Sequence, residues 1–481
     1  MNPTYEVQNY INGRFEDRSG ETIPVLNPAT GAVLAELADT PAHEVENAVS
    51  AATAAQPAWA KRPAIERAGY LRAIAARIRG QVEPIARLIS EEQGKILPLS
   101  RVEVAFAADY LDYMAEWARR IEGEIIPSDR AQENIFMFRI PLGVVAGILP
   151  WNFPFFLIVR KLAPALLTGN TIVIKPSEET PLNAHAFMRL ADEVGLPPGV
   201  VNFIYGKGPT AGQALAASPQ VGLVSFTGSV ATGSRIMHAA ADNITKVNLE
   251  LGGKAPAIVL ADADQELAVK AITASRVINS GQVCNCAERV YVQREIAAEF
   301  TDKLAAAMKA TRFGNPLESE DLDYGPLINE AGLRKVDQLV TGAVSAGAKV
   351  VTGGRIADRN PGNYYEPTVL ADCRQEMEIV QREVFGPVLP VVAVDDLDQA
   401  IAFANQSDYG LTSSLYTRDL NRAMRACNEL RFGETYINRE NFEAMQGYHA
   451  GLRKSGIGGA DGKHGLLEYT QTHMVYLQYQ S

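Results

Sequence analysis

Short apolar runs alternate with longer amphipathic stretches between residues 144 and 250. The runs are rich in Val and Ile, which is typical of strands buried on both faces, and the stretches between them have helical spacing. Thr180-Pro181 provides the start signal of one helix and Gly195 its end. Strands that alternate with helices in this way predict βαβ units and a parallel sheet. The predicted strands are 144–149, 171–174, 200–204, 222–226 and 246–249.

The pattern changes on both sides of this segment. Residues 1–120 begin with a β-rich stretch, including a hairpin signal at 10–14, and continue as long Ala-rich helices. Residues 255–440 predict a second α/β region. Two further segments, 121–140 and 470–479, have the pattern of strands that belong to neither core. The strands predicted for the second region lie near 289–293, 388–394 and 412–417.

Polar side chains follow the predicted strands of the first region at the same end. The carboxyl ends of parallel strands meet at one edge of a sheet, and ligands bind in the crevice outside that edge. We therefore expect these side chains to share a site. They are Asn152 after the first strand, Lys175 and Glu178 after the second, Gly206-Lys207-Gly208 after the third, Thr227-Gly228-Ser229 after the fourth and Glu250 after the fifth.

Composition narrows the class of protein. A chain of 481 residues predicts two or three domains, and 47% hydrophobic and 21% charged residues are ordinary for a soluble protein. The net charge of −11 argues against a nucleic-acid partner, because phosphate binding needs a basic face. The most apolar run, 143–159, is interrupted by Pro150 and Pro154 and is too short to span a membrane, so no membrane partner is expected.

The cysteines favour a reducing compartment. Four cysteines in so long a chain do not form a disulfide framework, and residues 1–6 lack the regions of a signal peptide, so a cytoplasmic location is expected. Most free cysteines are small buried residues, but Cys284 follows a glycine at the start of a new α/β region, which favours a nucleophile. Cys286 is assigned a structural role. No metal is predicted, because zinc needs further ligands and Cys373 is distant in sequence.

Two further residues supply chemistry that a thiol nucleophile needs. Glu250 is followed by Gly252 and Gly253, which allow a ligand to approach closely, so its carboxylate is a candidate general base rather than only a loop acid. Asn152 lies between Trp151 and Phe153 in a turn bracketed by prolines. Such an amide is usually a satisfied turn residue, but it is also a suitable donor to an oxyanion, together with the backbone N–H of the cysteine.

The cofactor signals are weaker. Lys175 and Glu178 after a strand are typical of a ribose site, although such residues are often only solvated. Gly228 to Gly233 opens a helix whose free N–H groups favour a diphosphate, but the spacing is not the G-x-G-x-x-G fingerprint. The histidines offer no evident triad, and the chain lacks a G-x-S-x-G elbow, a Walker loop and an H-E-x-x-H motif.

The motifs together resemble the NAD(P)-dependent aldehyde dehydrogenase superfamily over essentially the whole chain. The resemblance rests on Pro150-Trp151-Asn152, Lys175-Pro176-Ser177-Glu178, Leu249-Glu250-Leu251-Gly252-Gly253-Lys254, Gly281-Gln282-Val283-Cys284 and Glu383-Val384-Phe385-Gly386-Pro387. It implies Cys284 as nucleophile, Glu250 as general base and Asn152 as oxyanion donor. It also implies NAD as cofactor, bound by Pro150, Trp151, Lys175, Ser177, Glu178, Gly228, Ser229, Leu251, Glu383 and Phe385.

The same resemblance implies an α/β architecture in three parts. These are an NAD-binding domain of Rossmann type (1–120 and 141–249), a catalytic domain (250–440) and a small β arm that forms homodimers or homotetramers (121–140 and 461–481). Residues 148–158 and 438–447 further resemble the bacterial branch that oxidises lactaldehyde and glycolaldehyde. That branch implies a short polar aldehyde as substrate, lined by Arg160, Asn285, Glu443 and His449.

Other activities remain open at this point. Arg160 favours an anionic aldehyde, such as a semialdehyde, as the second candidate substrate. A dehydrogenase that passes its thioester to coenzyme A would share the thiol, but it would not need Glu250 to activate water. A thiol hydrolase would leave Lys175 and Glu178 unexplained, and a non-catalytic relative would be expected to lose Cys284.

Overall fold

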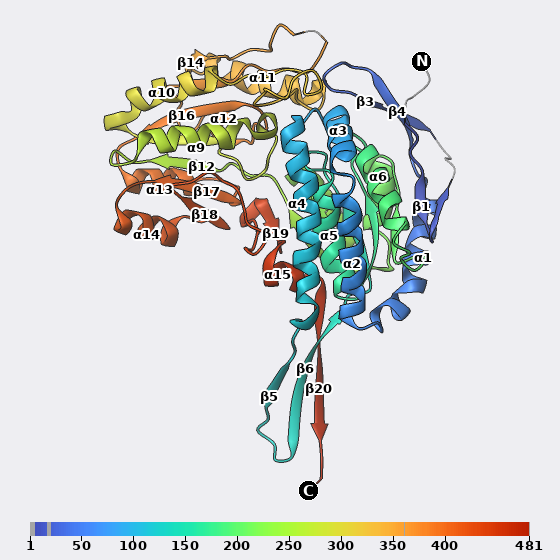
Figure 1. The fold of residues 1–481 in the computed structure, drawn as a ribbon. Helices are drawn as coiled ribbons and strands as arrows, with labels where there is room; N and C mark the ends of the chain where they lie inside the picture. Colours follow the sequence, from blue (N-terminus) through green and yellow to red (C-terminus); the bar gives the residue numbers. More distant parts are fainter. Residues whose placement is uncertain (1–4, 17–20, 360, 481) are drawn as a thin grey trace.

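The computed structural model describes residues 5–16, 21–359 and 361–480. Residues 1–4, on which part of the signal-peptide argument rests, lie outside the described residues. Two α/β units lie side by side, and a narrow β arm projects below them (Figure 1). The α/β class predicted from the apolar runs is confirmed. No helix of the described residues is both long and apolar enough to cross a membrane.

The first unit contains an eight-stranded sheet in the order β19-β11-β10-β7-β8-β9-β1-β2. Its five central strands are parallel, and they coincide with the five runs predicted from the sequence. The hairpin signal near the start of the chain forms the antiparallel pair β1–β2. The strands are β1 (Asn9–Ile11), β2 (Arg14–Glu16), β7 (Val144–Ile148), β8 (Thr171–Lys175), β9 (Val201–Phe203), β10 (Val221–Thr227), β11 (Lys246–Glu250) and β19 (Gly456–Ile457).

Helices cover both faces of this sheet because successive strand residues point to opposite sides. Val145 and Ile172 pack into the core of α2–α6, whereas Val144 and Val173 pack toward α1, α7 and α8. Helix α6 begins one residue after Pro181, and its end is followed by Gly195 with φ +72°. The helices are α1 (Ala42–Ala60), α2 (Ala64–Arg79), α3 (Val82–Gln93), α4 (Leu97–Glu116), α5 (Phe156–Leu167), α6 (Leu182–Asp192), α7 (Gln213–Ala216) and α8 (Val230–Ala241).

The second unit contains a seven-stranded sheet in the order β14-β15-β16-β13-β12-β17-β18. Helices α9 and α10 pack on one face, and α11, α13 and α14 pack on the other. The strands are β12 (Pro256–Val259), β13 (Arg289–Gln293), β14 (Lys349–Thr352), β15 (Thr368–Ala371), β16 (Val388–Val394), β17 (Thr412–Tyr416) and β18 (Glu434–Ile437). The helices are α9 (Gln265–Val277), α10 (Ala297–Lys309), α11 (Glu330–Ser345), α12 (Glu378–Gln381), α13 (Leu397–Asn405) and α14 (Leu420–Glu429).

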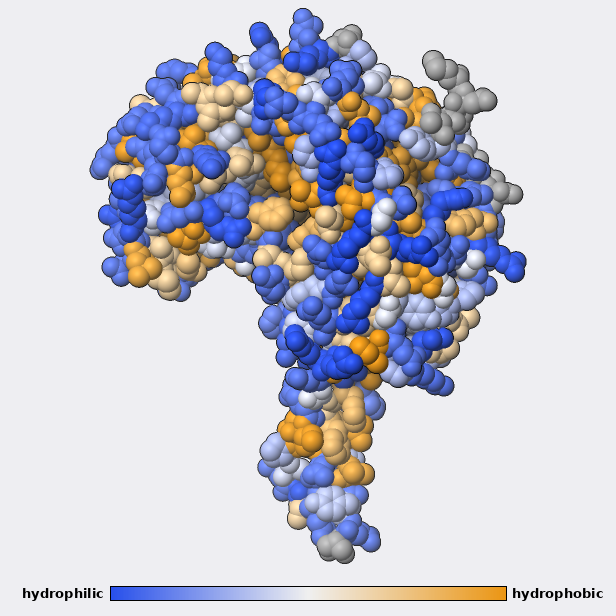
Figure 2. All heavy atoms as spheres, in the orientation of Figure 1, coloured by the Kyte–Doolittle hydropathy of each residue, from blue (hydrophilic) through white to orange (hydrophobic). Residues whose placement is uncertain are grey.

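The arm is a separate three-stranded antiparallel sheet. It consists of β5 (Glu124–Pro127), β6 (Glu133–Pro141) and β20 (Thr470–Gln478), with β6 in the centre. Apolar side chains gather on its surface (Figure 2), including Phe138 and Tyr476, which are 48% and 64% exposed. A further two-stranded sheet, β3 (Thr22–Leu26) with β4 (Val33–Ala38), belongs to the first unit's outer side.

Segments next to strands of both large sheets meet at one junction. The carboxyl ends of β7, β10 and β11 lead into Asn152, Gly228 and Glu250. The segments just before β13 and β16, at the amino ends of those strands, carry Cys284 and Glu383. The strand order 9-8-7-10-11 reverses direction between β7 and β10, and such a reversal point is where open α/β sheets bind ligands.

Candidate active site

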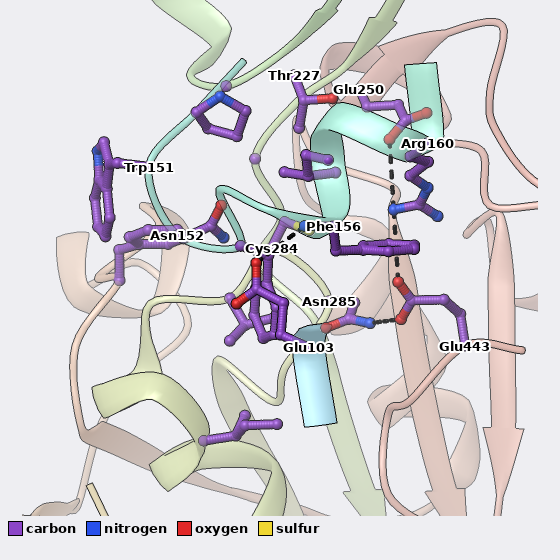
Figure 3. A pocket seen from close by; sticks show the side chains of 18 of the residues that line it. Glu103, Trp151, Asn152, Phe156, Arg160, Thr227, Glu250, Cys284, Asn285 and Glu443 are labelled. Carbon is purple, nitrogen blue, oxygen red and sulfur yellow. Dashed lines mark hydrogen bonds and ion pairs between the residues drawn. The ribbon is translucent and has the colours of Figure 1, made fainter. Parts of the chain in front are cut away.

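A cavity of about 300 Å³ lies at this junction, and both units line it. It brings together most of the residues predicted from the sequence (Figure 3). Phe106 of α4 and Phe442 also line it, and the sequence patterns did not indicate either. The predicted residues that line it are Pro150, Trp151, Asn152, Arg160, Gly228, Ser229, Glu250, Leu251, Cys284, Asn285, Glu383, Phe385 and Glu443.

A strained turn presents Cys284 to the cavity. Asn279, Ser280 and Gly281 have φ angles of +47°, +61° and +76°, so three successive residues adopt the left-handed region. Only Gly281 does so without steric cost, and a Cβ there would lie 2.3 Å from the carbonyl oxygen of Gly386. Strain of this kind persists where the surroundings enforce it, and it is common at functional sites.

Asn152 and the cysteine turn exchange hydrogen bonds. The side-chain amide of Asn152 donates to the carbonyl of Gln282 at 3.0 Å, and Asn279 donates back to the carbonyl of Asn152 at 3.0 Å. An amide nitrogen carries two hydrogens, so the second N–H of Asn152 can still donate to an oxygen beside Cys284. The exchange fixes the turn after β7 against the turn before β13.

Glu250 ends β11 and is almost fully buried. Its Oε2 makes no hydrogen bond with any described residue, and its nearest cation is the Nη1 of Arg160 at 3.8 Å. Lys161, the residue after Arg160 in α5, donates to the hydroxyl groups of Ser225 and Thr227 rather than to Glu250. Burial lowers the pKa of Lys161 to about 8. Glu250 lines the cavity, and a carboxylate with an oxygen that no hydrogen bond occupies can accept a proton from a water bound beside it.

Three predicted substrate residues form a connected polar wall (Figure 3). The side chain of Asn285 donates to the carboxylate of Glu443, whose other oxygen lies 3.6 Å from Arg160. Arg160 projects from α5, with the ring of Phe156 one turn earlier 5.4 Å from its guanidinium carbon. Polar groups of this kind in an otherwise aromatic pocket suit a small ligand with hydroxyl groups.

His449 lies deeper than predicted and does not line the cavity. Its Nδ1 lies 2.9 Å from Glu434 of β18, and its ring also contacts the side chain of Cys284. Burial and the charge of Arg160 lower the pKa of His449, but the hydrogen bonds to Cys284 and Glu434 outweigh them and raise that pKa well above its ordinary value. The sequence did not indicate Glu434, since no local motif marks it.

The predicted cofactor residues occupy the other side of the junction. Trp151 and Phe385 form an edge-to-face pair with centroids 5.6 Å apart. Glu383 accepts a hydrogen bond from the N–H of Gly253 at 2.9 Å, and burial followed by the charge of Glu288 raises the pKa of Glu383 to about 7. Lys175, Ser177 and Glu178 lie outside the cavity at the end of β8.

These residues fit a dinucleotide. Lys175 and Glu178 are paired at 2.8 Å beside the β8 end, where an adenosine ribose would find both a cation and a carboxylate. Helix α8 begins after Ser229, whose side chain accepts the N–H of Thr232, so the N–H groups of Val230 and Ala231 remain for a diphosphate. A Cβ at Gly252 would lie 2.5 Å from the carboxylate of Glu383, so only glycine leaves that acid free to bind a ligand.

Glu288 is a buried acid that the sequence patterns did not indicate, and it contacts segments on both sides of the cavity. Glu288 binds Lys254 at 2.7 Å and Arg276 at 2.8 Å, and it accepts the N–H groups of Val384 and Phe385 at 3.0 and 3.1 Å. Burial raises the pKa of Glu288, but the two cations more than compensate and lower that pKa to about 2. Glu288 is therefore charged at neutral pH.

Comparison with known proteins identifies the protein family. The family model described as "Aldehyde dehydrogenase family" matches residues 15–475. The chain belongs to this family, and the predicted resemblance and oxidoreductase class are confirmed.

Individual relatives are more specific. The chain is 63% identical over 470 residues to lactaldehyde dehydrogenase of Escherichia coli (strain K12), covering 98% of each chain. A crystal structure of lactaldehyde dehydrogenase from E. coli superimposes with a TM-score of 0.97, covering 98% of this chain and 99% of that one. Betaine aldehyde dehydrogenase from Staphylococcus aureus in complex with NAD+ is 35% identical, with a TM-score of 0.96 and coverage of 98% and 95%.

We predict that Glu288→Gln lowers the free energy of unfolding by about 3–5 kcal/mol, because two buried cations lose their counter-charge. Since its pKa lies below the ordinary value, the contribution of Glu288 is complete above about pH 4.5 and is lost as the pH falls toward 2. Urea unfolding at neutral pH measures the change. The matched control is Glu299→Gln, which breaks an exposed pair with Lys303 and should leave the free energy of unfolding almost unchanged. Equal losses in the two variants would contradict the prediction.

Proposed function

We propose that this protein oxidises a short, polar hydroxyaldehyde to its carboxylic acid with NAD. The single observation that carries the proposal is the convergence of the Cys284 thiol, the free carboxylate oxygen of Glu250 and the Asn152 amide on one cavity. A nucleophile, a base and an oxyanion donor in one small pocket suit acyl chemistry on a carbonyl carbon. The identity of 63% to lactaldehyde dehydrogenase supports a hydroxyaldehyde as substrate.

The residues of the chain act in sequence. The Cys284 thiol first loses its proton, and the thiolate sulfur then bonds to the aldehyde carbon. The second N–H of Asn152 and the backbone N–H of Cys284 stabilise the resulting oxyanion. The chemistry that NAD supplies when bound is acceptance of the hydride released as this thiohemiacetal becomes a thioester. Glu250 then takes a proton from a water molecule, whose oxygen attacks the thioester carbon. The carbon–sulfur bond breaks, which releases the acid and restores the thiolate, and Glu250 then gives its proton back to solvent.

We assign the cofactor residues to two groups. The adenosine and diphosphate would be held by helix α8 and by Pro150, Lys175, Ser177, Glu178, Gly228 and Ser229. The nicotinamide riboside would be held by Trp151, Leu251, Glu383 and Phe385. Lys175 outweighs the effect of burial on Glu178 and lowers the pKa of that carboxyl, so it is charged at neutral pH. A charged Glu178 repels the 2′-phosphate of NADP, which supports a preference for NAD.

Arg160 supports a second candidate substrate, an aldehyde that carries a carboxylate. Two carboxylates flank the Nη1 of Arg160, Glu250 at 3.8 Å and Glu443 at 3.6 Å, and both oppose a further anion. Transfer of the thioester to coenzyme A is disfavoured, because the free oxygen of Glu250 suits activation of water.

We further propose a homodimer or homotetramer joined through the arm. Exposed apolar residues on so small a sheet, including Ile125 and Leu477, favour burial against another copy. We also propose a cytoplasmic location, in keeping with four free cysteines.

We predict that Cys284→Ala abolishes NADH formation from aldehyde and NAD, because the variant lacks the nucleophile. Absorbance at the NADH band measures oxidation, and titration calorimetry should show that NAD still binds. The matched control is Cys427→Ala on exposed α14, which should retain full activity. Turnover by the Cys284→Ala variant would disprove the mechanism.

Glu250→Gln should release one equivalent of NADH rapidly and then turn over slowly, because hydride release precedes the step that needs the base. Loss of a general base typically costs ~10²–10⁴-fold in rate. Rapid-mixing absorbance separates the burst from the slow phase. A variant that lacks both a burst and a slow phase would assign Glu250 a different role.

Among aldehydes, glycolaldehyde and lactaldehyde should give a higher kcat/KM than hexanal. Arg160, Asn285 and Glu443 are desolvated by a methylene chain that cannot pair with them, and unpaired buried polar groups are costly. Measurement of the three aldehydes in one buffer, with NAD and then with NADP, tests substrate and cofactor preference together. A tenfold advantage for hexanal would show that these side chains do not face the aldehyde.

A further inference from the structure

Asp461 stands where a helix cap is expected, but it does not cap the helix. It immediately precedes α15 (Gly462–Leu467), a position at which an Asp side chain ordinarily accepts N–H groups of the first turn. The Asp461 side chain makes no such bond. It is 2% exposed and turns toward Arg160 instead, with Oδ1 3.0 Å from Nε and Oδ2 accepting from Nη2.

The backbone is strained to achieve this. Asp461 has φ +68°, a left-handed value that a residue other than glycine keeps only where its surroundings enforce it. Here Ala460 and His449 exchange backbone hydrogen bonds at 2.8 and 3.0 Å, and the N–H of Gly462 donates to the carbonyl of Met445 at 2.9 Å. These bonds fix the residues on both sides of Asp461, so its carboxylate is held against Arg160.

The contact leaves one edge of the guanidinium for the pocket. With Nε and Nη2 bound to Asp461, only Nη1 faces the carboxylates of Glu250 and Glu443, at 3.8 and 3.6 Å. Both distances are too long for a hydrogen bond. Without Asp461, the guanidinium would be free to turn and bind Glu250 directly, which would occupy the proposed base.

The pairing also sets the charge of the pocket. The charge of Arg160 is matched by Asp461, and His449 is matched by Glu434 behind the cavity. Lys161 is turned toward the hydroxyl groups of Ser225 and Thr227 rather than the cavity. Around Arg160, the charges that remain on the cavity wall are therefore the carboxylates of Glu250 and Glu443. The other charged residues that line the cavity are Glu103, which is paired with Lys95, and Lys335 and Glu383.

We propose that Asp461 is a positioning residue that determines specificity: by matching the charge of Arg160, it makes the pocket favour neutral hydroxyaldehydes over aldehydes that carry a carboxylate. The inference rests on the proposed function and extends it. Asp461 acts through Arg160, since it does not line the cavity. Specificity of this kind depends on repulsion of the wrong ligand as well as on attraction of the right one.

The test is Asp461→Asn, assayed with lactaldehyde and succinic semialdehyde in one buffer. The variant removes one of the three carboxylates around Arg160, which makes the pocket less negative by one charge, so the ratio of kcat/KM for the semialdehyde to that for lactaldehyde should rise at least tenfold. Turnover of lactaldehyde should fall and show an NADH burst, because Arg160 binds Glu250. The matched control is Asp262→Asn, which breaks a surface pair with Arg422 at 3.3 Å and should leave the ratio unchanged.

Three results overturn the inference. An equal loss for both aldehydes in Asp461→Asn, with an unchanged ratio, means that Asp461 only supports the fold; wild-type oxidation of lactaldehyde then leaves the proposed function intact. Wild-type protein that oxidises neither aldehyde overturns both. If Asp461→Asn does not fold, the same assay is run on the double variant Arg160→Met/Asp461→Leu. This variant buries no charge at either position, so it avoids an unpaired buried charge. The double variant removes the cation together with its counter-charge, so its ratio should not rise, and a tenfold rise would overturn the inference.

Discussion

The geometry of the pocket depends on the carboxylate of Glu288, which contacts neither the cavity nor solvent. It pairs with Lys254 and Arg276 and accepts the N–H groups of Val384 and Phe385. Arg276 in turn donates to the carbonyl of Gly281, in the turn before Cys284. A single side chain thereby fixes the segment that carries the proposed nucleophile relative to the segment that carries the acid proposed to bind nicotinamide riboside.

Charge rather than apolar packing fixes these segments, and this choice has a physical reason. Apolar contacts tolerate small displacements, whereas a buried charge that loses its partner costs several kcal/mol, so an ion triad permits one arrangement only. The exchanged amide bonds of Asn152 and Asn279 apply the same constraint between the two sheets. A tetrahedral carbon needs its sulfur and its oxyanion donor held to within a fraction of an ångström, which this network supplies.

Local rules predicted the sheets and the polar residues at the strand ends, whereas the resemblance to the family supplied the roles of Arg160, Asn285, Glu383, Phe385 and Glu443. Apolar runs marked the parallel strands, and the residues after them necessarily gathered at one edge. The positioning residues followed no such rule. Glu288 is the residue before strand β13, and Glu434 is the first residue of β18. Asp461 precedes helix α15, where a capping residue is common. Their partners lie far along the chain; Arg160 and Asp461, for example, are 301 residues apart, so only the tertiary fold reveals them.

The arm gives the chain a defined order of assembly during synthesis. Its central strand β6 pairs along its whole length with β20, and Gln471 and Pro141 at that junction are separated by 330 residues. Until β20 leaves the ribosome, β6 has only the short hairpin partner β5 and an open, partly apolar edge. Such edges invite pairing with other chains. The nascent protein therefore exposes this partly apolar edge until β20, which lies about 330 residues further along the chain, has been made and covers it.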